Sequence, residues 1–216
     1  CGGAGTCKKC MMLISDAQGI SYRLACQTKV TPGCEVTLEE SSEMSISLGG
    51  AFGPWPADGE AGGYGLAFDI GTTTVVVRLY DLASGAELAT ESGWNAQAPY
   101  GADVISRIQY TLEQPDGLQE LSQRSREQVW SLIGRALARC GREADTLREI
   151  TLVGNTVMQH LFAGLPVRSI AAAPFAPLSL FDGDTADTLL GAPVFYAPCV
   201  AGYVGGDVTA GLLASG

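Results

Sequence analysis

Gly65-Leu-Ala-Phe-Asp-Ile-Gly-Thr-Thr-Thr-Val-Val-Val-Arg-Leu-Tyr-Asp81 is the stretch that decides the fold: two apolar runs joined by a turn of glycine and threonine. Residues 65–70 predict a short strand, and residues 74–81 predict a second strand. A further turn at 83–85 leads into a third strand that ends near Trp94. The sequence therefore predicts an antiparallel β-meander.

The turn between the first two strands has the chemistry of a magnesium–phosphate site. Asp69 ends the first strand and can organise Mg²⁺, usually through water. The amides and hydroxyls of Gly71, Thr72, Thr73 and Thr74 can receive phosphate oxygens. Asp-x-Gly-Thr also occurs in aspartic proteases, but the β-meander and the threonine pair favour a site for ATP and Mg²⁺.

Two later segments complete the predicted phosphate site. Residues 150–156 read as a strand followed by a helix start, with Asn155 as the cap. In residues 201–209, the pair Gly205 and Gly206 makes room for phosphate, and Asp207 is placed for metal or water. These segments resemble the phosphate motifs of the actin-like, sugar-kinase and heat-shock-chaperone ATPase superfamily. The final adenosine motif is missing from the sequence, so we expect an incomplete domain of this type.

A helical pattern lies between these segments. Core positions recur at helical intervals, whereas Arg124, Glu127, Gln128 and Arg135 lie towards the other face. The core positions are Leu118, Leu121, Ser125, Val129, Leu132, Ile133, Ala136 and Leu137. Packing is also the expected role of His160, unless it is solvated. We expect Cys140 to end the helix, and Cys199 to be buried in an apolar strand.

The sequence also begins with a cysteine cluster. Cys1, Cys7 and Cys10 have C-x5-C-x2-C spacing in a glycine-rich loop, which is close to the spacing used for [2Fe-2S] clusters. A strand–turn–strand pattern over residues 11–25 predicts a hairpin that returns Cys26 to Cys10. The four cysteines therefore predict a [2Fe-2S] site. A tetrahedral zinc site and a disulfide are the alternatives.

The cysteine segment resembles the cysteine-bearing half of a plant-type two-iron ferredoxin domain. The phrase Leu24-Ala-Cys-Gln-Thr28 strengthens this likeness, whereas Lys8 stands where such loops usually have glycine. Cys34 is a spare thiol that could replace Cys26, although an ordinary loop or strand cysteine is the simpler interpretation.

Composition narrows the classes of partner and location. The net charge of −10 opposes nonspecific attraction to nucleic acid or anionic lipid, so we expect neither as a partner. No apolar stretch approaches a membrane-spanning length, and no export signal is evident, so we expect a cytoplasmic protein. The sequence begins at a cysteine rather than at Met, and we expect it to be an internal fragment of a longer protein.

The fold class predicted is α/β with three parts. Residues 1–38 form the C-terminal part of a [2Fe-2S] ferredoxin domain, which is β-rich. Residues 39–63 are a linker, since they turn polar and then rich in Gly and Pro. Residues 64–216 form the first half of an actin-like (ribonuclease H-like) ATPase domain.

Together, the cysteine segment and the predicted ATPase segment resemble the reductive activators of corrinoid-dependent enzymes. The likeness includes the cluster and phosphate motifs and three further phrases, at residues 95–108, 153–158 and 201–207. For Tyr100 to Arg107, helix-start packing is the only role that we predict.

The resemblance implies an enzyme that uses ATP to return a corrinoid protein from Co(II) to Co(I), with electrons arriving from an upstream donor through the cluster. It assigns metal and water positioning to Asp69 and Asp207. The alternatives are an actin-like kinase or chaperone-type ATPase with a structural metal site, and a nonenzymatic iron–sulfur electron carrier. An activator of the acyl-CoA dehydratase type is disfavoured, because it carries a four-iron cluster between subunits.

Overall fold

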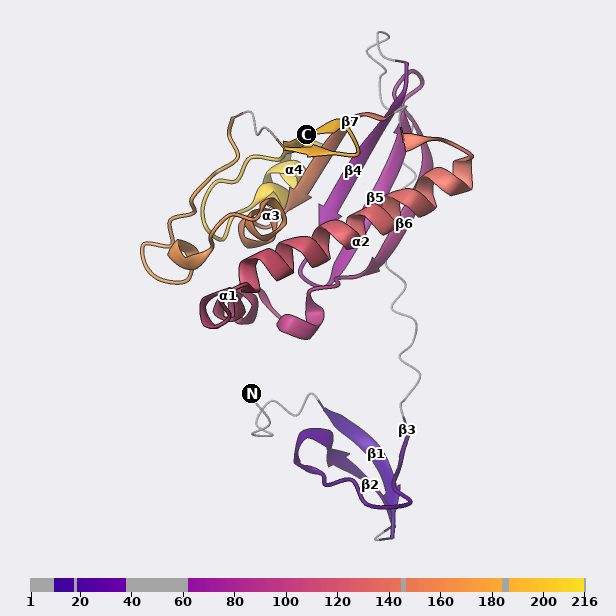
Figure 1. Cartoon of the computed structure of the whole chain (residues 1–216), viewed down its shortest axis with the longest axis vertical. Helices are drawn as coiled ribbons and strands as arrows, with labels where there is room; N and C mark the ends of the chain where they lie inside the picture. Colours follow the sequence, from indigo (N-terminus) through magenta and orange to yellow (C-terminus); the bar gives the residue numbers. More distant parts are fainter. Residues whose placement is uncertain (1–9, 18, 38–61, 145–146, 184–186, 216) are drawn as a thin grey trace. The chain divides into compact units, whose positions relative to one another are not determined.

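The computed structural model describes residues 10–17, 19–37, 62–144, 147–183 and 187–215 (Figure 1). Contacts between Cα atoms divide the chain into two compact units, residues 1–47 and 48–216, which are described separately. Cys1, Cys7, Lys8 and most of the predicted linker lie outside the described residues.

The first unit contains a small antiparallel sheet of order β2-β1-β3. Its strands are β1 (Met11–Asp16), β2 (Gly19–Leu24) and β3 (Glu35–Thr37). The predicted hairpin is present, because Met11 of β1 pairs with Leu24 of β2. The sequence pattern did not reveal β3, which has only three residues and no buried side chain.

The second unit is built on a sheet of order β6-β5-β4-β7-β9-β8. Its strands are β4 (Tyr64–Ile70), β5 (Thr74–Asp81), β6 (Ala86–Trp94), β7 (Leu147–Gly154), β8 (Thr188–Leu189) and β9 (Ala192–Tyr196). β4, β5 and β6 form the predicted antiparallel meander, and β7 pairs in parallel with β4. β9 is in turn parallel to β7. Parallel neighbours end at the same edge of a sheet, so the polar residues that follow β4 and β7 are brought together.

Among the residues that the structure describes, four α-helices accompany this sheet: α1 (Val104–Glu113), α2 (Gly117–Cys140), α3 (Thr156–Ala163) and α4 (Gly206–Ser215). The long helix α2 lies across one face of the sheet and contacts β5 and β6 (Figure 1). It ends at Gly141, which is left-handed with a φ of 60°. α1 begins at a capping box between Asp103 and Ser106, in which each side-chain oxygen accepts from the backbone N–H of the other residue.

The core lies between the sheet and the helices α2 and α3. Val75, Val77 and Leu79 alternate along β5 and are fully buried, as expected for one face of a strand. The predicted core positions of α2 are also buried, except for Leu118, which is partly buried against the same core. The prediction of a scaffolding helix is therefore confirmed.

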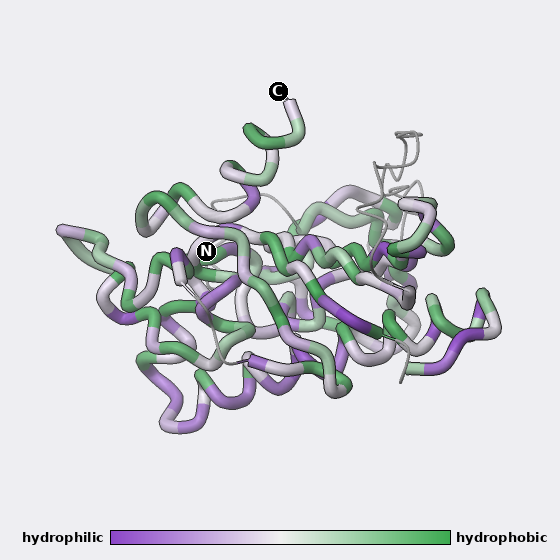
Figure 2. The backbone as a smooth tube through the Cα atoms, turned by 90° about the horizontal axis from the view of Figure 1, so that it is seen from above, coloured by the Kyte–Doolittle hydropathy of each residue, from purple (hydrophilic) through white to green (hydrophobic). Residues whose placement is uncertain are grey.

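The last helix presents apolar side chains to solvent. Leu212 and Leu213 are 67% and 86% exposed. Figure 2 shows this part of α4 as a hydrophobic segment beside the C-terminus. Gly206 is the only residue of α4 that is buried among those the structure describes, so the helix contacts the rest of the unit at its first turn.

Candidate phosphate-binding site

The turn after β4 is closed by its own backbone. The N–H of Gly71 donates to the carbonyl of Thr74 over 2.9 Å. A Cβ at residue 71 would lie 2.8 Å from that carbonyl oxygen, so a side chain there would push the turn open. Glycine is therefore required at this position, in agreement with the predicted tight turn.

Asn155 connects this turn to the start of α3. Its Nδ2 donates to the Thr72 hydroxyl over 3.1 Å, and its Oδ1 accepts from the N–H of Met158 over 3.0 Å. The predicted helix cap is confirmed. The same side chain also holds the predicted phosphate turn at a fixed place beside the helix.

Gly205 brings the start of α4 against the start of α3. A Cβ on Gly205 would lie 2.5 Å from both the Cα of Asn155 and the backbone N of Thr156. At the next position, the N–H of Gly206 donates to Oε1 of Gln159 over 3.0 Å. The predicted glycine pair therefore allows main chain to approach main chain.

The charge of Asp207 acts on Asp69, although the two predicted acidic residues are far apart in the sequence. Asp69 is exposed, yet the packing around the strand end removes part of its hydration and raises its pKa. The negative charge of Asp207, in the first turn of α4, raises the pKa of Asp69 further. Two carboxylates that repel in this way favour a cation between or beside them.

The structure thus brings the segments of the predicted site to one edge of the sheet. The turn supplies one side of this site, Asn155 and the start of α3 supply the middle, and the start of α4 supplies the other side. The predicted residues in these segments are Asp69, Gly71, Thr72, Thr73, Thr74, Asn155, Gly205, Gly206 and Asp207. Oxygen ligands for Mg²⁺ and a glycine-lined turn for phosphate fit Mg²⁺–ATP.

The cysteine site is described only in part, since Cys1 and Cys7 lie outside the described residues. Cys10 and Cys26 lie at the same end of the β1–β2 hairpin, and the N–H of Ala25 donates to the Cys10 carbonyl over 2.8 Å. Hydrogen bonds from Cys26 lower the pKa of the Cys10 thiol, with the larger effect from the Cys26 backbone and the smaller from its side chain. A thiol with a depressed pKa beside a second thiol fits metal ligation. The described residues contain no group of three or more potential ligands.

The other singled-out residues have packing roles. His160 is fully buried, with Nδ1 against the Thr156 carbonyl at 2.7 Å and Nε2 accepting from the Ser179 N–H over 3.2 Å. Burial lowers the pKa of His160, so it is neutral and packed rather than solvated. Cys199 is buried as predicted, but the predicted strand was wrong, because this residue follows β9 in a loop. The Cys199 thiol donates to Oε1 of Gln159 over 3.2 Å, so this loop packs against α3.

Three buried polar residues behind the turn were missed. Asn95, Gln97 and Arg107 are 2%, 0% and 0% exposed, and two of them donate to carbonyls of the turn. In the sequence they are visible only as polar residues that lie just before or within the start of a helix. Periodicity cannot distinguish such a buried polar network from a solvated surface.

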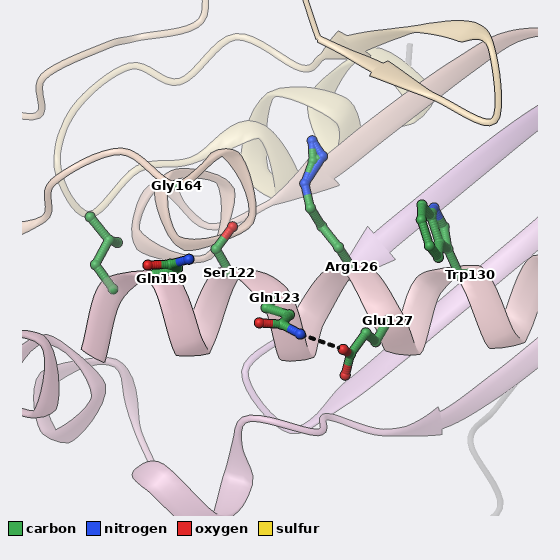
Figure 3. Close-up of a pocket in the computed structure, with 8 residues that line it drawn as sticks. Gln119, Ser122, Gln123, Arg126, Glu127, Trp130 and Gly164 are labelled. Carbon is green, nitrogen blue, oxygen red and sulfur yellow. Dashed lines mark hydrogen bonds between the residues drawn. The ribbon is translucent and has the colours of Figure 1, made fainter. Parts of the chain in front are cut away.

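A separate groove of about 530 Å³ follows α2. Figure 3 shows Arg126 and Trp130 extending from this helix, and Gln123 donating to Glu127. Arg126 is held by Asp187 in an ion pair of 2.6 Å. The residues that line the groove include none of the predicted phosphate-site residues.

No helix among the described residues is long and apolar enough to cross a membrane.

Comparisons with known proteins agree with the observed fold. The corrinoid activation enzyme RamQ of Eubacterium limosum is 36% identical over 156 residues, which are 69% of this chain and 26% of RamQ. A solved structure of a reductive activator for corrinoid, iron-sulfur protein is 40% identical, with a TM-score of 0.69. The match covers 73% of this chain and 26% of that one. The chain spans about a quarter of the length of both relatives.

These comparisons confirm the predicted mixed α/β fold class with part of an actin-like domain, and the predicted resemblance to reductive activators. A model of the RACo middle region matches residues 64–216, which include the meander, all four helices and the candidate phosphate site. The chain belongs to the RACo middle region family.

Proposed function

We propose that the protein containing this chain is an ATP-dependent reductive activator that converts a corrinoid protein from Co(II) to Co(I). Its relatives include an enzyme named for corrinoid activation and a reductive activator for a corrinoid, iron-sulfur protein. In this proposal, an upstream donor supplies electrons through a [2Fe-2S] cluster. Cys1, Cys7, Cys10 and Cys26 are its proposed ligands.

The observation that carries the ATP part of the proposal is the convergence of Asp69 and Asp207. The Asp207 charge raises the pKa of Asp69, so both carboxylates act on the same region, beside a turn that only glycine can close. We assign them to Mg²⁺ and water positioning. Bound Mg²⁺–ATP would supply the free energy that an unfavourable reduction needs.

Coupling requires that nucleotide binds two conformations of the activator with different affinity. The proposed phosphate ligands come from the turn at 71–74, Asn155, Gly205 and Gly206. Because Gly206 begins α4 and Gly205 directly precedes it, the position of α4 relative to α3 would change the shape of the site. The predicted domain division belongs to the same proposal: residues 1–38 as ferredoxin part, 39–63 as linker and 64–216 as ATPase part. The cytoplasmic location stays a prediction.

The test is the yield of Co(I) on a cognate corrinoid protein, measured by absorption under anaerobic conditions with a fixed electron donor. We expect Mg²⁺–ATP to increase this yield with the full-length protein, and Asp69→Ala to abolish the increase. Asp81→Ala is the matched control, because Asp81 ends β5 at the opposite edge of the sheet, where it pairs with Tyr64. It should retain the stimulation.

The outcomes separate the alternatives. A Co(I) yield that does not depend on nucleotide would contradict ATP coupling, even if the protein still passes electrons. Stoichiometric zinc with no two-iron signal would favour an ATPase with a structural metal site.

A further inference from the structure

The carbonyl groups of the phosphate turn are held by groups beneath it. Nδ2 of Asn95 donates to the Gly71 carbonyl over 2.7 Å, and Nη2 of Arg107 donates to the Thr72 carbonyl over 2.6 Å. The backbone N–H of Asn95 donates to the Thr73 carbonyl over 2.8 Å. Three consecutive carbonyl oxygens, which would repel a phosphate, are therefore engaged by the protein.

This arrangement fixes the direction of the amides as well. In a trans peptide the C=O of one residue and the N–H of the next point in opposite directions. Engaging the Gly71 and Thr72 carbonyls therefore turns the N–H groups of Thr72 and Thr73 away from Asn95 and Arg107. In the part of the chain that the structure describes, neither N–H donates to a protein group. Both are available for an anion.

Gln97 joins the two donors into one network. Its N–H donates to Oδ1 of Asn95 over 2.8 Å, and its Oε1 accepts from Nη1 of Arg107 over 3.3 Å. Its own Nε2 donates to the Leu121 carbonyl in α2 over 2.9 Å. Arg107 is also fixed by donation from Nε to the Gly101 carbonyl over 3.0 Å. The network is buried and attached to two helices, so its geometry is set without a ligand.

Arg107 brings a positive charge to this buried position. Among the described residues it forms no ion pair and donates only to neutral acceptors, including Sδ of Met158 at 3.2 Å. Burial lowers the pKa of Arg107 to about 10, although the charge of Asp103 opposes this shift. The guanidinium is thus charged at neutral pH and incompletely compensated, which favours an anion at the turn in front of it.

We infer that Asn95, Gln97 and Arg107 form a positioning cradle that sets the phosphate turn for the nucleotide phosphates before they bind. The cradle binds the carbonyl groups of the turn, so that the N–H groups of the turn point away from the cradle. Arg107 adds a positive charge behind the turn. This inference rests on the proposed function, because it assigns the second layer of the same ATP site. Its members are positioning residues, since their contacts are to the turn and to one another.

The test compares Mg²⁺–ATP affinity with folding stability in the full-length protein. Arg107→Lys keeps the charge but cannot reproduce the forked contacts, and we expect the dissociation constant to rise about tenfold. Arg107→Met removes charge and contacts together and should weaken binding further. Calorimetry gives the affinity, and the melting temperature without nucleotide gives the stability.

Two control variants separate positioning from general destabilisation. Ile108→Val removes one buried methyl group beside Arg107 on the same helix, and Arg124→Met removes an exposed arginine. We expect Ile108→Val to lower the melting temperature and Arg124→Met to leave it unchanged, with Mg²⁺–ATP affinity within about twofold of wild type for both. Equal loss of affinity in Ile108→Val and Arg107→Lys at equal loss of stability would overturn the inference.

The same experiment distinguishes this inference from the proposed function. If wild type binds Mg²⁺–ATP and both Arg107 variants bind it equally well, the cradle has no positioning role and the proposed function stands. If wild type does not bind Mg²⁺–ATP, the proposed function and the cradle fail together. If Arg107→Met does not fold, Arg107→Lys alone decides between these outcomes.

Discussion

Asn155 and Thr72 are joined by a side-chain hydrogen bond of 3.1 Å across 83 residues of sequence. This bond connects the turn after β4 to the cap of α3. The turn and the helix are therefore one structural feature, although they belong to different strand–loop segments.

The two roles of Asn155 can be separated by substitution. Asn155→Ala should lower the free energy of unfolding by about 1 kcal/mol through loss of the cap. Asn155→Ser should restore most of this stability, because serine also caps helices, but its shorter side chain cannot reach Thr72. We expect both variants to bind Mg²⁺–ATP more weakly than wild type, as measured by calorimetry beside urea unfolding. Full recovery of affinity with serine would show that the bond to Thr72 is dispensable.

The close approach at Gly205 predicts a strong effect from one methyl group. Gly205→Ala places a Cβ within 2.5 Å of the Asn155 main chain, and we expect a loss of about 1 to 3 kcal/mol of stability. Gly211→Ala, within the helix α4 that follows Gly205, is the control, since open space surrounds that position. It should stabilise by up to about 1 kcal/mol, because alanine is the better helix former. Similar denaturation midpoints for the two variants would contradict the described packing.

The negative charge of Asp69 should lower the free energy of unfolding of the nucleotide-free protein at neutral pH, because the pKa of Asp69 is raised in the folded state. A carboxyl whose pKa is raised in the folded state favours folding at pH values below its unfolded pKa, and this contribution is lost as pH rises through the folded pKa. Removing the charge by Asp69→Asn should therefore raise the melting temperature slightly at neutral pH. The gain should disappear as the pH falls towards about 4. Exposure of Asp69 keeps the effect small.

The same variant should respond differently to nucleotide. We expect Mg²⁺–ATP to raise the melting temperature of wild type but not of Asp69→Asn, because the amide is a poor ligand for Mg²⁺ compared with a carboxylate. A variant that is destabilised without nucleotide, or that is stabilised by nucleotide as much as wild type, would argue against the assigned role.

The hairpin predicts which cysteines hold iron. Cys26 lies beside Cys10, so Cys26→Ser should remove the two-iron absorption and EPR signal after anaerobic reconstitution of the full-length protein. Cys34→Ser is the matched control and should keep both signals. Cys34 lies in a separate turn, in which its N–H donates to the Thr31 carbonyl. Loss of the signal in Cys34→Ser alone would reassign the fourth ligand.

Local patterns predicted much of this fold. The alternation along β5 and the helical spacing of residues 118–137 each specify one element and the face that it buries, so the meander and α2 could be derived without the structure. Asn155 was predictable for the same reason, because a cap acts on its own helix. The strand β3 was not, since it is short and exposed and is held only by pairing with β1.

The sequence named residues of the candidate site, and their binding of phosphate and Mg²⁺ stays a prediction. It did not indicate the residues that hold the turn in place. Asp69 and Gly71 belong to a recognisable turn, whereas Arg107 contacts that turn across 35 residues of sequence. Its role depends on the path of the chain between β6 and α1, which no local periodicity records. The loop position of Cys199 was missed for a similar reason, because an apolar segment can be buried without being a strand.

The missing side chain at Gly205 has a mechanical consequence. Where two elements meet through side chains, a small displacement of one is absorbed by rotamer changes. Here the main chain at the start of α4 packs directly on the main chain at the start of α3. Rotamer changes therefore cannot absorb a displacement at this contact. A displacement of α4 would therefore move Asn155, and through its hydrogen bond also Thr72, so that the position of the helix would control the geometry of the turn.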